Sequence, residues 1–132
     1  MIRNLSGVII WTDNLERLAY FYQEVLGLEP HSVRENFIAF RWKINDQEIR
    51  FSIGTHSSVK GRNTDRFRFM TNFDVDDIKQ ISSSLKSKGV EFLREPEREH
   101  WGGLKRQFGL ARLEVAACQK LAQINGLTLG IW

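Results

Sequence analysis

One pattern occurs twice in this chain. Residues 7–30 and residues 68–96 each read as an apolar strand, an acidic turn, an amphipathic helix, a glycine, and a second strand that ends at Glu-Pro. The two helix starts, Asn14 and Asp77, are 63 residues apart, and the two glycines, Gly27 and Gly89, are 62 apart. A shift of one residue over a whole module is small. The sequence therefore predicts a duplicated βα unit, in which a group in one copy has a counterpart position in the other.

The two helices carry recognisable start signals and apolar faces. Asp13 is expected to cap the first helix, with Glu16 as its reciprocal partner. Asp76 and Asp77 are expected to open the second, where negative charge suits the helix dipole. The predicted buried faces are Leu15, Leu18, Tyr22 and Val25 in the first helix and Ile78, Ile81 and Leu85 in the second.

Short apolar segments rich in β-branched and aromatic residues predict the strands. A turn at Asn45–Asp46–Gln47 separates two of them. The expected strands cover residues 5–11, 28–33, 36–44, 48–53, 66–74 and 90–94.

The C-terminal part is harder to interpret. Residues 104–108 could form a strand after a glycine turn. Residues 111–124 place Leu113, Ala117, Leu121 and Ile124 at helical spacing, which favours a helix over a strand. This tail is either a natural replacement that packs on the fold or unrelated sequence appended by a shifted reading frame.

Composition narrows the function classes. No apolar run is long enough to cross a bilayer, and the N-terminus lacks the apolar stretch of a secretory signal. The single cysteine, Cys118, cannot form an internal disulfide, which favours a cytoplasmic location. Residues 1–103 are charge-balanced and the net +3 belongs to residues 104–132, so we expect neither a nucleic acid nor a membrane as partner.

The repeated unit, with the string DNLERLAYFYQEVLGLEP, resembles the vicinal oxygen chelate superfamily, which includes glyoxalase I, bleomycin-resistance proteins and extradiol dioxygenases. The resemblance extends from residue 5 to about residue 108 and includes Trp101-Gly102-Gly103. It implies an α+β fold of two βαβββ modules whose mixed sheet forms a cup, and it implies a homodimer. We expect a single domain over residues 1–132. It comprises module 1 (1–54), a linker (55–65), module 2 (66–108) and an atypical tail (109–132).

The metal-ligand positions of that superfamily are not retained. Its metal-dependent members carry a histidine seven residues before the helix-opening Asp or Asn, and counting back from Asn14 and Asp77 gives Gly7 and Met70. Neither residue is a usual ligand for a borderline divalent metal. The third family ligand, a late glutamate, has no confident match, and His31, His56 and His100 do not replace the missing ligands. We therefore expect no metal and no other cofactor.

Strand alternation predicts which side chains face the cup. Ile9 and Trp11 share a face in the first module, and Met70 and Asn72 share one in the second. Their alternative role is to fill a closed core. Three further candidates are Arg41 and Arg50, either of which could bind a carboxylate or phosphate, and Trp101, which could stack on a flat ligand or anchor a turn.

The leading hypothesis is a metal-independent small-molecule binding protein of the bleomycin-resistance type, which holds an aromatic or cationic ligand in the cup. One alternative is an enzyme of the same superfamily, such as a lyase, an isomerase or a dioxygenase. A second alternative is an assembly module without a small ligand, in which the apolar tail serves a partner chain.

Overall fold

The computed structural model describes residues 1–61, 63, 69–94, 111–116 and 127–131. The chain divides into two compact units, Met1–Gly61 and Arg62–Trp132.

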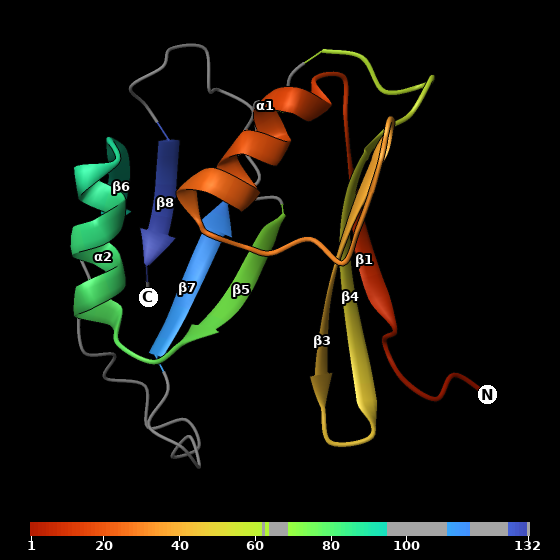
Figure 1. Cartoon of the computed structure of the whole chain (residues 1–132), viewed down its shortest axis with the longest axis horizontal. Helices are drawn as coiled ribbons and strands as arrows, with labels where there is room; N and C mark the ends of the chain where they lie inside the picture. Colours follow the sequence, from red (N-terminus) through yellow and green to blue (C-terminus); the bar gives the residue numbers. More distant parts are fainter. Residues whose placement is uncertain (62, 64–68, 95–110, 117–126, 132) are drawn as a thin grey trace. The chain divides into compact units, whose positions relative to one another are not determined.

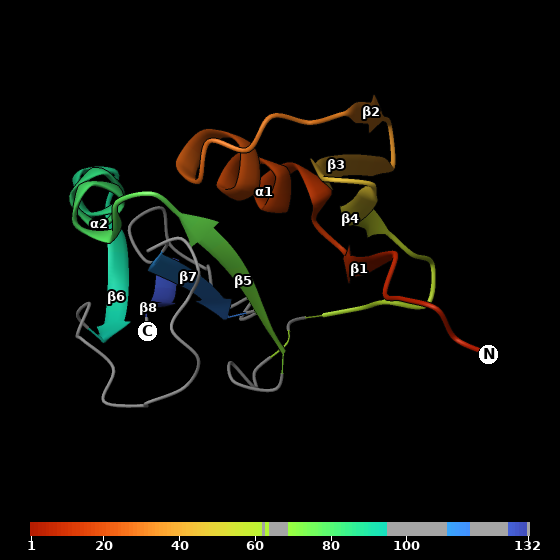
Figure 2. The same ribbon diagram turned by 90° about the horizontal axis from the view of Figure 1, so that it is seen from below.

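The first unit is a four-stranded mixed sheet with one helical segment. Its strands are β1 (Gly7–Thr12), β2 (Ser32–Arg34), β3 (Phe37–Ile44) and β4 (Gln47–Thr55). Strand β1 runs parallel to β4, whereas β4 with β3 and β3 with β2 are antiparallel. Figure 2 shows the resulting order β1-β4-β3-β2.

Helix α1 (Leu15–Tyr20) continues into a π-helical turn, η1 (Phe21–Val25), and together they cover one face of this sheet (Figure 1). Tyr22 is the centre of the core: it is 2% exposed, and its ring lies edge-on to Phe51 with centroids 4.9 Å apart. Phe40 stacks on Phe51 at 5.8 Å, and Ile53 is fully buried beside them. Alternate strand residues thus supply the core, because successive side chains of a strand point to opposite faces.

The start of α1 differs from the sequence-based expectation. The capping residue is Asn14, whose Oδ1 accepts a hydrogen bond from the Arg17 amide at 3.1 Å. Its own amide donates to Thr12 Oγ1 at 3.0 Å, which fixes the chain before the helix. Asp13 instead accepts a hydrogen bond from the Gly61 amide at 2.8 Å, so it ties down the end of the unit. The prediction that Asp13 caps the helix is wrong because Asn14 is the residue that reaches a free helical N–H.

The helix ends as predicted at Gly27, which has a φ of 73°. The Leu28 amide then donates to the Tyr22 carbonyl at 2.9 Å, so the chain is still closing the helix where a strand over 28–33 was expected. Pro30 has no N–H to give to a ladder. The next strand therefore begins only at Ser32.

The second unit repeats the same order of elements. It contains β5 (Met70–Val75), α2 (Ile78–Ser87), β6 (Val90–Arg94), β7 (Ala111–Ala116) and β8 (Leu127–Ile131). These bounds confirm the predicted strand over 90–94. They also confirm the α+β class with two βαβββ modules and mixed sheets.

The order of strands in the second sheet is β5-β7-β8-β6, which Figure 1 shows beside α2. Strand β5 pairs antiparallel with β7, and β8 runs parallel to β6. In the first unit the opening strand pairs with the last strand, and in the second it pairs with the last but one. The two modules therefore share their sequence of elements but not their strand order.

The tail supplies two of the four strands of this sheet. The favoured helix over 111–124 is wrong for Ala111–Ala116, which form β7; residues 117–124 lie outside the described residues, as do residues 104–108. The segment ARLEVA alternates polar and apolar residues, which suits a strand as well as a helix turn. Backbone pairing with β5 on one side and β8 on the other decides between the two.

Helix α2 is capped at both ends as predicted. The Asp77 carboxylate accepts from the amides of Lys79 at 2.8 Å and Gln80 at 3.1 Å. Gly89, with a φ of 79°, terminates it. Leu85 is its fully buried residue, and Ile78 and Ile81 are half-buried. Within the part of the chain that the structure describes, no helix is long and apolar enough to cross a membrane.

Candidate functional site: the sheet face opposite α1

The first sheet has a second face, on the side away from α1. Residues that pair in register share a face, so the pairing of β1, β3 and β4 defines its members. Along β4, Arg50 pairs with Gly7 and Arg41, Ser52 with Ile9 and Ala39, and Gly54 with Trp11 and Phe37. We call these residues, together with the pair Lys43 and Glu48, the distal face.

One end of the distal face is aromatic. The Trp11 ring lies 6.0 Å from the Phe37 ring and 5.3 Å from the His56 ring, which meets it edge-on. A Cβ on Gly54 would come within 2.9 Å of Trp11 and 2.8 Å of Phe37. The glycine therefore lets both rings lie close over β4. Trp11 remains 37% exposed, so part of this cluster, the aromatic end, faces outward.

The other end of the distal face carries charged side chains, which we call the arginine end. Glu48 Oε1 accepts from Arg50 Nε at 2.6 Å, and Glu48 Oε2 lies 3.6 Å from Arg41 Nη1. The Arg50 hydrogen bond, aided by the charges of Arg50, Arg41 and Lys43, holds the pKa of the Glu48 carboxyl below its usual value. One carboxylate thus orients two guanidinium groups, while the Arg50 side chain stays 69% exposed.

The ends are separated by smaller side chains. Gly54 and Arg50 lie four residues apart on β4, which corresponds to about 13 Å of extended strand. Ile9, Ser52 and Ala39 form the single row of paired residues between them, and Ile9 is 49% exposed. Of the predicted site residues, the structure thus brings Ile9, Trp11, Arg41 and Arg50 onto one face.

The other predicted site residues belong to the second unit. Met70 and Asn72 lie on β5, where Met70 is half-buried and Asn72 is exposed. They pair with Ala116 and Glu114 of β7. Thr71, between them, has a buried hydroxyl oxygen that finds no hydrogen-bond partner among the described residues. Trp101 lies outside the described residues, as does His100.

The residues at the family's metal positions do not fit a divalent metal. Gly7 offers no donor atom, and a Cβ there would lie 2.8 Å from the Arg50 carbonyl oxygen, so a histidine would force the two strands apart. Met70 offers only a thioether, which suits soft metals. Among the described residues, no group of three or more His, Cys, Asp or Glu side chains could hold a metal ion.

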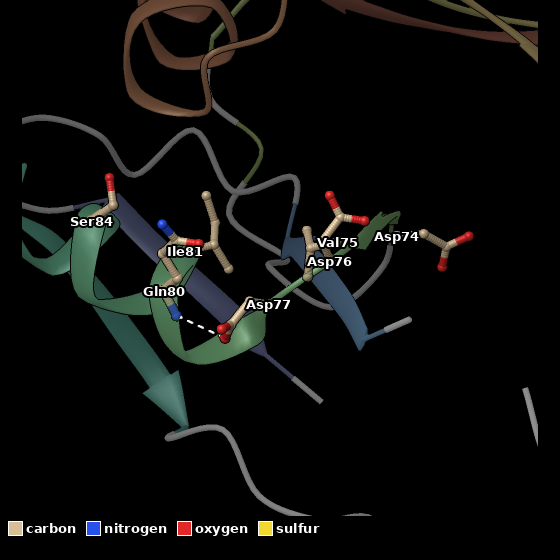
Figure 3. A pocket seen from close by; sticks show the side chains of 7 residues that line it. All are labelled: Asp74, Val75, Asp76, Asp77, Gln80, Ile81 and Ser84. Atoms are coloured by element: carbon tan, nitrogen blue, oxygen red, sulfur yellow. Dashed lines mark hydrogen bonds between the residues drawn. The ribbon is translucent and has the colours of Figure 1, made fainter. Parts of the chain in front are cut away.

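A separate depression lies in the second unit, where β5 ends and α2 begins (Figure 3). It has a volume of about 440 Å³, is wide open to solvent, and carries the carboxylates of Asp74, Asp76 and Asp77. Figure 3 shows that Asp77 is already hydrogen-bonded to Gln80, because it caps the helix. Asp77 therefore has a structural role at the start of α2.

Sequence reasoning missed two members of the distal face, Phe37 and Glu48, and it also missed His56, whose ring contacts Trp11. The signal for the first two was the turn between β3 and β4. It contains only Asn45 and Asp46, with Asn45 at a φ of 55°, and Ile44 pairs with Gln47. The predicted turn also included Gln47. A two-residue Asn-Asp turn would have placed Glu48 and Arg50 opposite Lys43 and Arg41.

Comparison with known proteins agrees with this architecture. The family model described as the glyoxalase/bleomycin resistance protein/dioxygenase superfamily matches residues 4–109. A curated relative from Bacillus subtilis (strain 168), the uncharacterized protein YetH, is 24% identical over 105 residues, which cover 77% of this chain and 86% of that protein. Because the family model spans most of the chain, including both helices and the strands that flank them, this protein belongs to the glyoxalase/bleomycin resistance protein/dioxygenase superfamily.

Proposed function

We propose that this protein is a metal-independent small-molecule binding protein, in which a flat ring of the ligand lies against the aromatic end of the distal face. The observation that carries the proposal is the arrangement of Trp11 over Gly54. Its ring is fixed by contacts with Phe37 and His56, yet it is 37% exposed. An exposed indole of fixed orientation is suited to stacking on aromatic or cationic groups.

The main competing role for Trp11 is to fill a core. The core of this unit lies on the other side of the sheet, around Tyr22, Phe40 and Phe51, and these side chains are at most 5% exposed. Removing Trp11 should therefore affect ligand binding more than folding. The positions where the family's metal-dependent members carry histidine ligands are Gly7 and Met70 in this chain. Neither residue suits a divalent metal, which favours a metal-free mode of binding.

The chain has four tryptophans, which allows a direct test. The protein would be labelled with 5-fluorotryptophan, and a library of small aromatic compounds would be screened by fluorine NMR and by thermal shift. The resonances would be assigned with single Trp→Phe variants. We expect ligands to shift the Trp11 resonance and to raise the melting temperature.

Trp42 provides a matched control. It is 36% exposed and lies on the same sheet, but its register places it on the α1 side. Trp11→Ala should abolish binding, and Trp42→Ala should preserve it. Binding that survives Trp11→Ala, or a library that leaves the Trp11 resonance unchanged, would contradict the proposal.

Metal independence and oligomeric state have their own tests. Elemental analysis of the purified protein should find no stoichiometric Ni, Zn, Mn or Fe; a full equivalent would favour the enzyme alternative. We further propose a homodimer, as is common in the superfamily. Size-exclusion chromatography with light scattering would give the mass of the protein in solution.

A further inference from the structure

We propose that the arginine end of the distal face is an anion subsite, so that the ligand is an aromatic anion whose ring contacts Trp11 and whose carboxylate or phosphate contacts Arg41 and Arg50. The inference rests on the proposed function. It assigns the chemical class of the ligand, which the aromatic end alone leaves open, since an exposed indole also attracts cations.

The hydrogen-bond geometry of Arg50 leaves the anion-binding part of its side chain available. Glu48 bonds to the Nε atom at 2.6 Å, and the interactions of the described residues include none to the two Nη atoms. The side chain is 69% exposed. A guanidinium that is held through Nε presents its terminal N–H groups in a fixed direction, which suits a planar carboxylate.

The second guanidinium comes from the neighbouring strand. Arg41 pairs with Arg50 in the ladder, and its Nη1 lies 3.6 Å from the other oxygen of Glu48. Two like charges at directly opposed positions repel each other unless a counter-ion lies between them. Glu48 supplies that counter-ion and so keeps both arginines on the same patch.

The charge balance of the arginine end favours an anion. Lys43 pairs with Glu48, so this end has three cationic side chains and one carboxylate. A ligand carboxylate would therefore meet a net positive patch, whereas an ammonium group would be repelled. Surface ion pairs alone contribute little to stability, so holding the hairpin together is a weak reason for the cluster.

The separation of the two ends limits the size of the ligand. About 13 Å of strand separates the aromatic pair from the arginine pair. The positions between them hold Ile9, Ala39 and Ser52, over which an alkyl or second aromatic group could lie. The ligand class is thus an elongated aromatic acid or an aromatic phosphate.

The test uses two probe series of opposite charge. One is a set of ω-phenylalkanoates from phenylacetate to 7-phenylheptanoate, and the other is the matching set of ω-phenylalkylamines. Dissociation constants would be measured from the fluorine resonance of Trp11 in the full-length protein. We expect the carboxylates to bind about tenfold more tightly than the amines, with an optimum at one chain length.

Variants identify the source of the preference. Arg50→Gln and Arg41→Gln should each weaken carboxylate binding about five- to tenfold and leave the amines unchanged or slightly improved. Arg17→Gln on α1, which covers the other face of the same sheet, removes the same charge on the side away from the distal face, and it should change binding less than about twofold. Inorganic phosphate added to the wild-type protein should compete with the carboxylates and not with neutral phenyl compounds.

Each outcome separates this inference from the proposed function. Equal binding of amines and carboxylates at Trp11 would overturn the anion subsite and leave the small-molecule function intact. A loss in Arg17→Gln as large as that in Arg50→Gln would also overturn it, because net charge would then explain the preference. If no phenyl probe of either charge binds, the inference fails. The proposed function is then decided separately, by the screen of small aromatic compounds described above.

Discussion

Two glycines of the distal face stand where a side chain would clash with its neighbours. At Gly54 a Cβ would meet Phe37 and Trp11 within 3 Å, so a side chain there would push the two rings away from the strand. At Gly7 a Cβ would crowd the carbonyl oxygen and Cβ of Arg50. The aromatic end thus depends on the absence of a side chain at Gly54. The close approach of β1 and β4 at Gly7 leaves no room for a metal-ligating side chain at that position.

The pKa of the Glu48 carboxyl can be measured in solution. Its pKa lies below the ordinary value of 4.5 because Arg50 donates a hydrogen bond to the charged form. A lowered folded-state pKa means that the stabilisation is present above the ordinary pKa and is lost as the pH falls through the lowered one. We expect the Glu48 carboxyl carbon to titrate below the ordinary value of 4.5 in carbon-13 NMR.

Replacing the donor provides the control for that titration. In Arg50→Gln the midpoint of Glu48 should rise back toward 4.5, and in Lys60→Gln it should not move. Lys60 is exposed and carries the same charge as Arg50, but it lies in the turn after β4. An unchanged midpoint in Arg50→Gln would mean that the hydrogen bond is not formed in solution.

At the scale of elements, neighbouring acids at one helix terminus have different roles. Asp76 and Asp77 both lie at the positive end of α2, so both gain from the dipole. Among the described residues, only Asp77 accepts hydrogen bonds there, from the amides of Lys79 and Gln80. We expect Asp77→Ala to lower the free energy of unfolding by about 1 kcal/mol and Asp76→Ala by a few tenths, as measured by urea denaturation.

Asp77→Asn separates capping from charge, because an asparagine side chain caps as well as aspartate does. That variant should stay within a few tenths of a kcal/mol of the wild type. Equal losses in Asp76→Ala and Asp77→Ala would show that the dipole, rather than the cap, determines the effect.

Local signals sufficed to predict the elements whose stability is local. Gly27 and Gly89 end the two helices as expected, both with positive φ, and Leu85 is buried as the period of α2 requires. The first helix departs from its period because η1 inserts a π turn, in which the Leu26 amide bonds to the Phe21 carbonyl. The wider turn brings both Phe21 and Tyr22 into the core, whereas Leu15 and Leu18 are half-buried.

The distal face was only partly predictable for a related reason. Alternation along one strand placed Ile9 and Trp11 together, because that rule is local. Bringing Phe37, Glu48 and Arg50 to the same face requires the register between strands, which depends on the length of the turn at Asn45. The strand at Ala111–Ala116 was missed because it is defined by pairing with β5, which is distant in sequence, and with β8, which follows it in the chain. Neither pairing is visible in the local pattern.

At the scale of the whole molecule, the two modules have diverged where the family match ends. The family model stops at residue 109, and the strands that follow, β7 and β8, are those whose order differs from the first unit. The body of the chain thus carries the superfamily pattern, and the tail completes the second sheet with sequence that the family model does not cover.

This arrangement predicts the effect of removing the tail. Strands β7 and β8 lie between β5 and β6 in the second sheet, so deletion of residues 109–132 leaves β5 and β6 without described neighbours in that sheet. A strand without neighbouring strands does not stay folded in water, because its backbone groups have no inter-strand hydrogen bonds. We expect amide hydrogen exchange in residues 70–94 to become fast, while residues 7–55, whose sheet is complete within the first unit, keep their protection. Unchanged protection of β5 and β6 would mean that the tail does not form the centre of that sheet in solution. The same deletion, followed by light scattering, tests the assembly alternative, because a dimer that survives it does not depend on the tail.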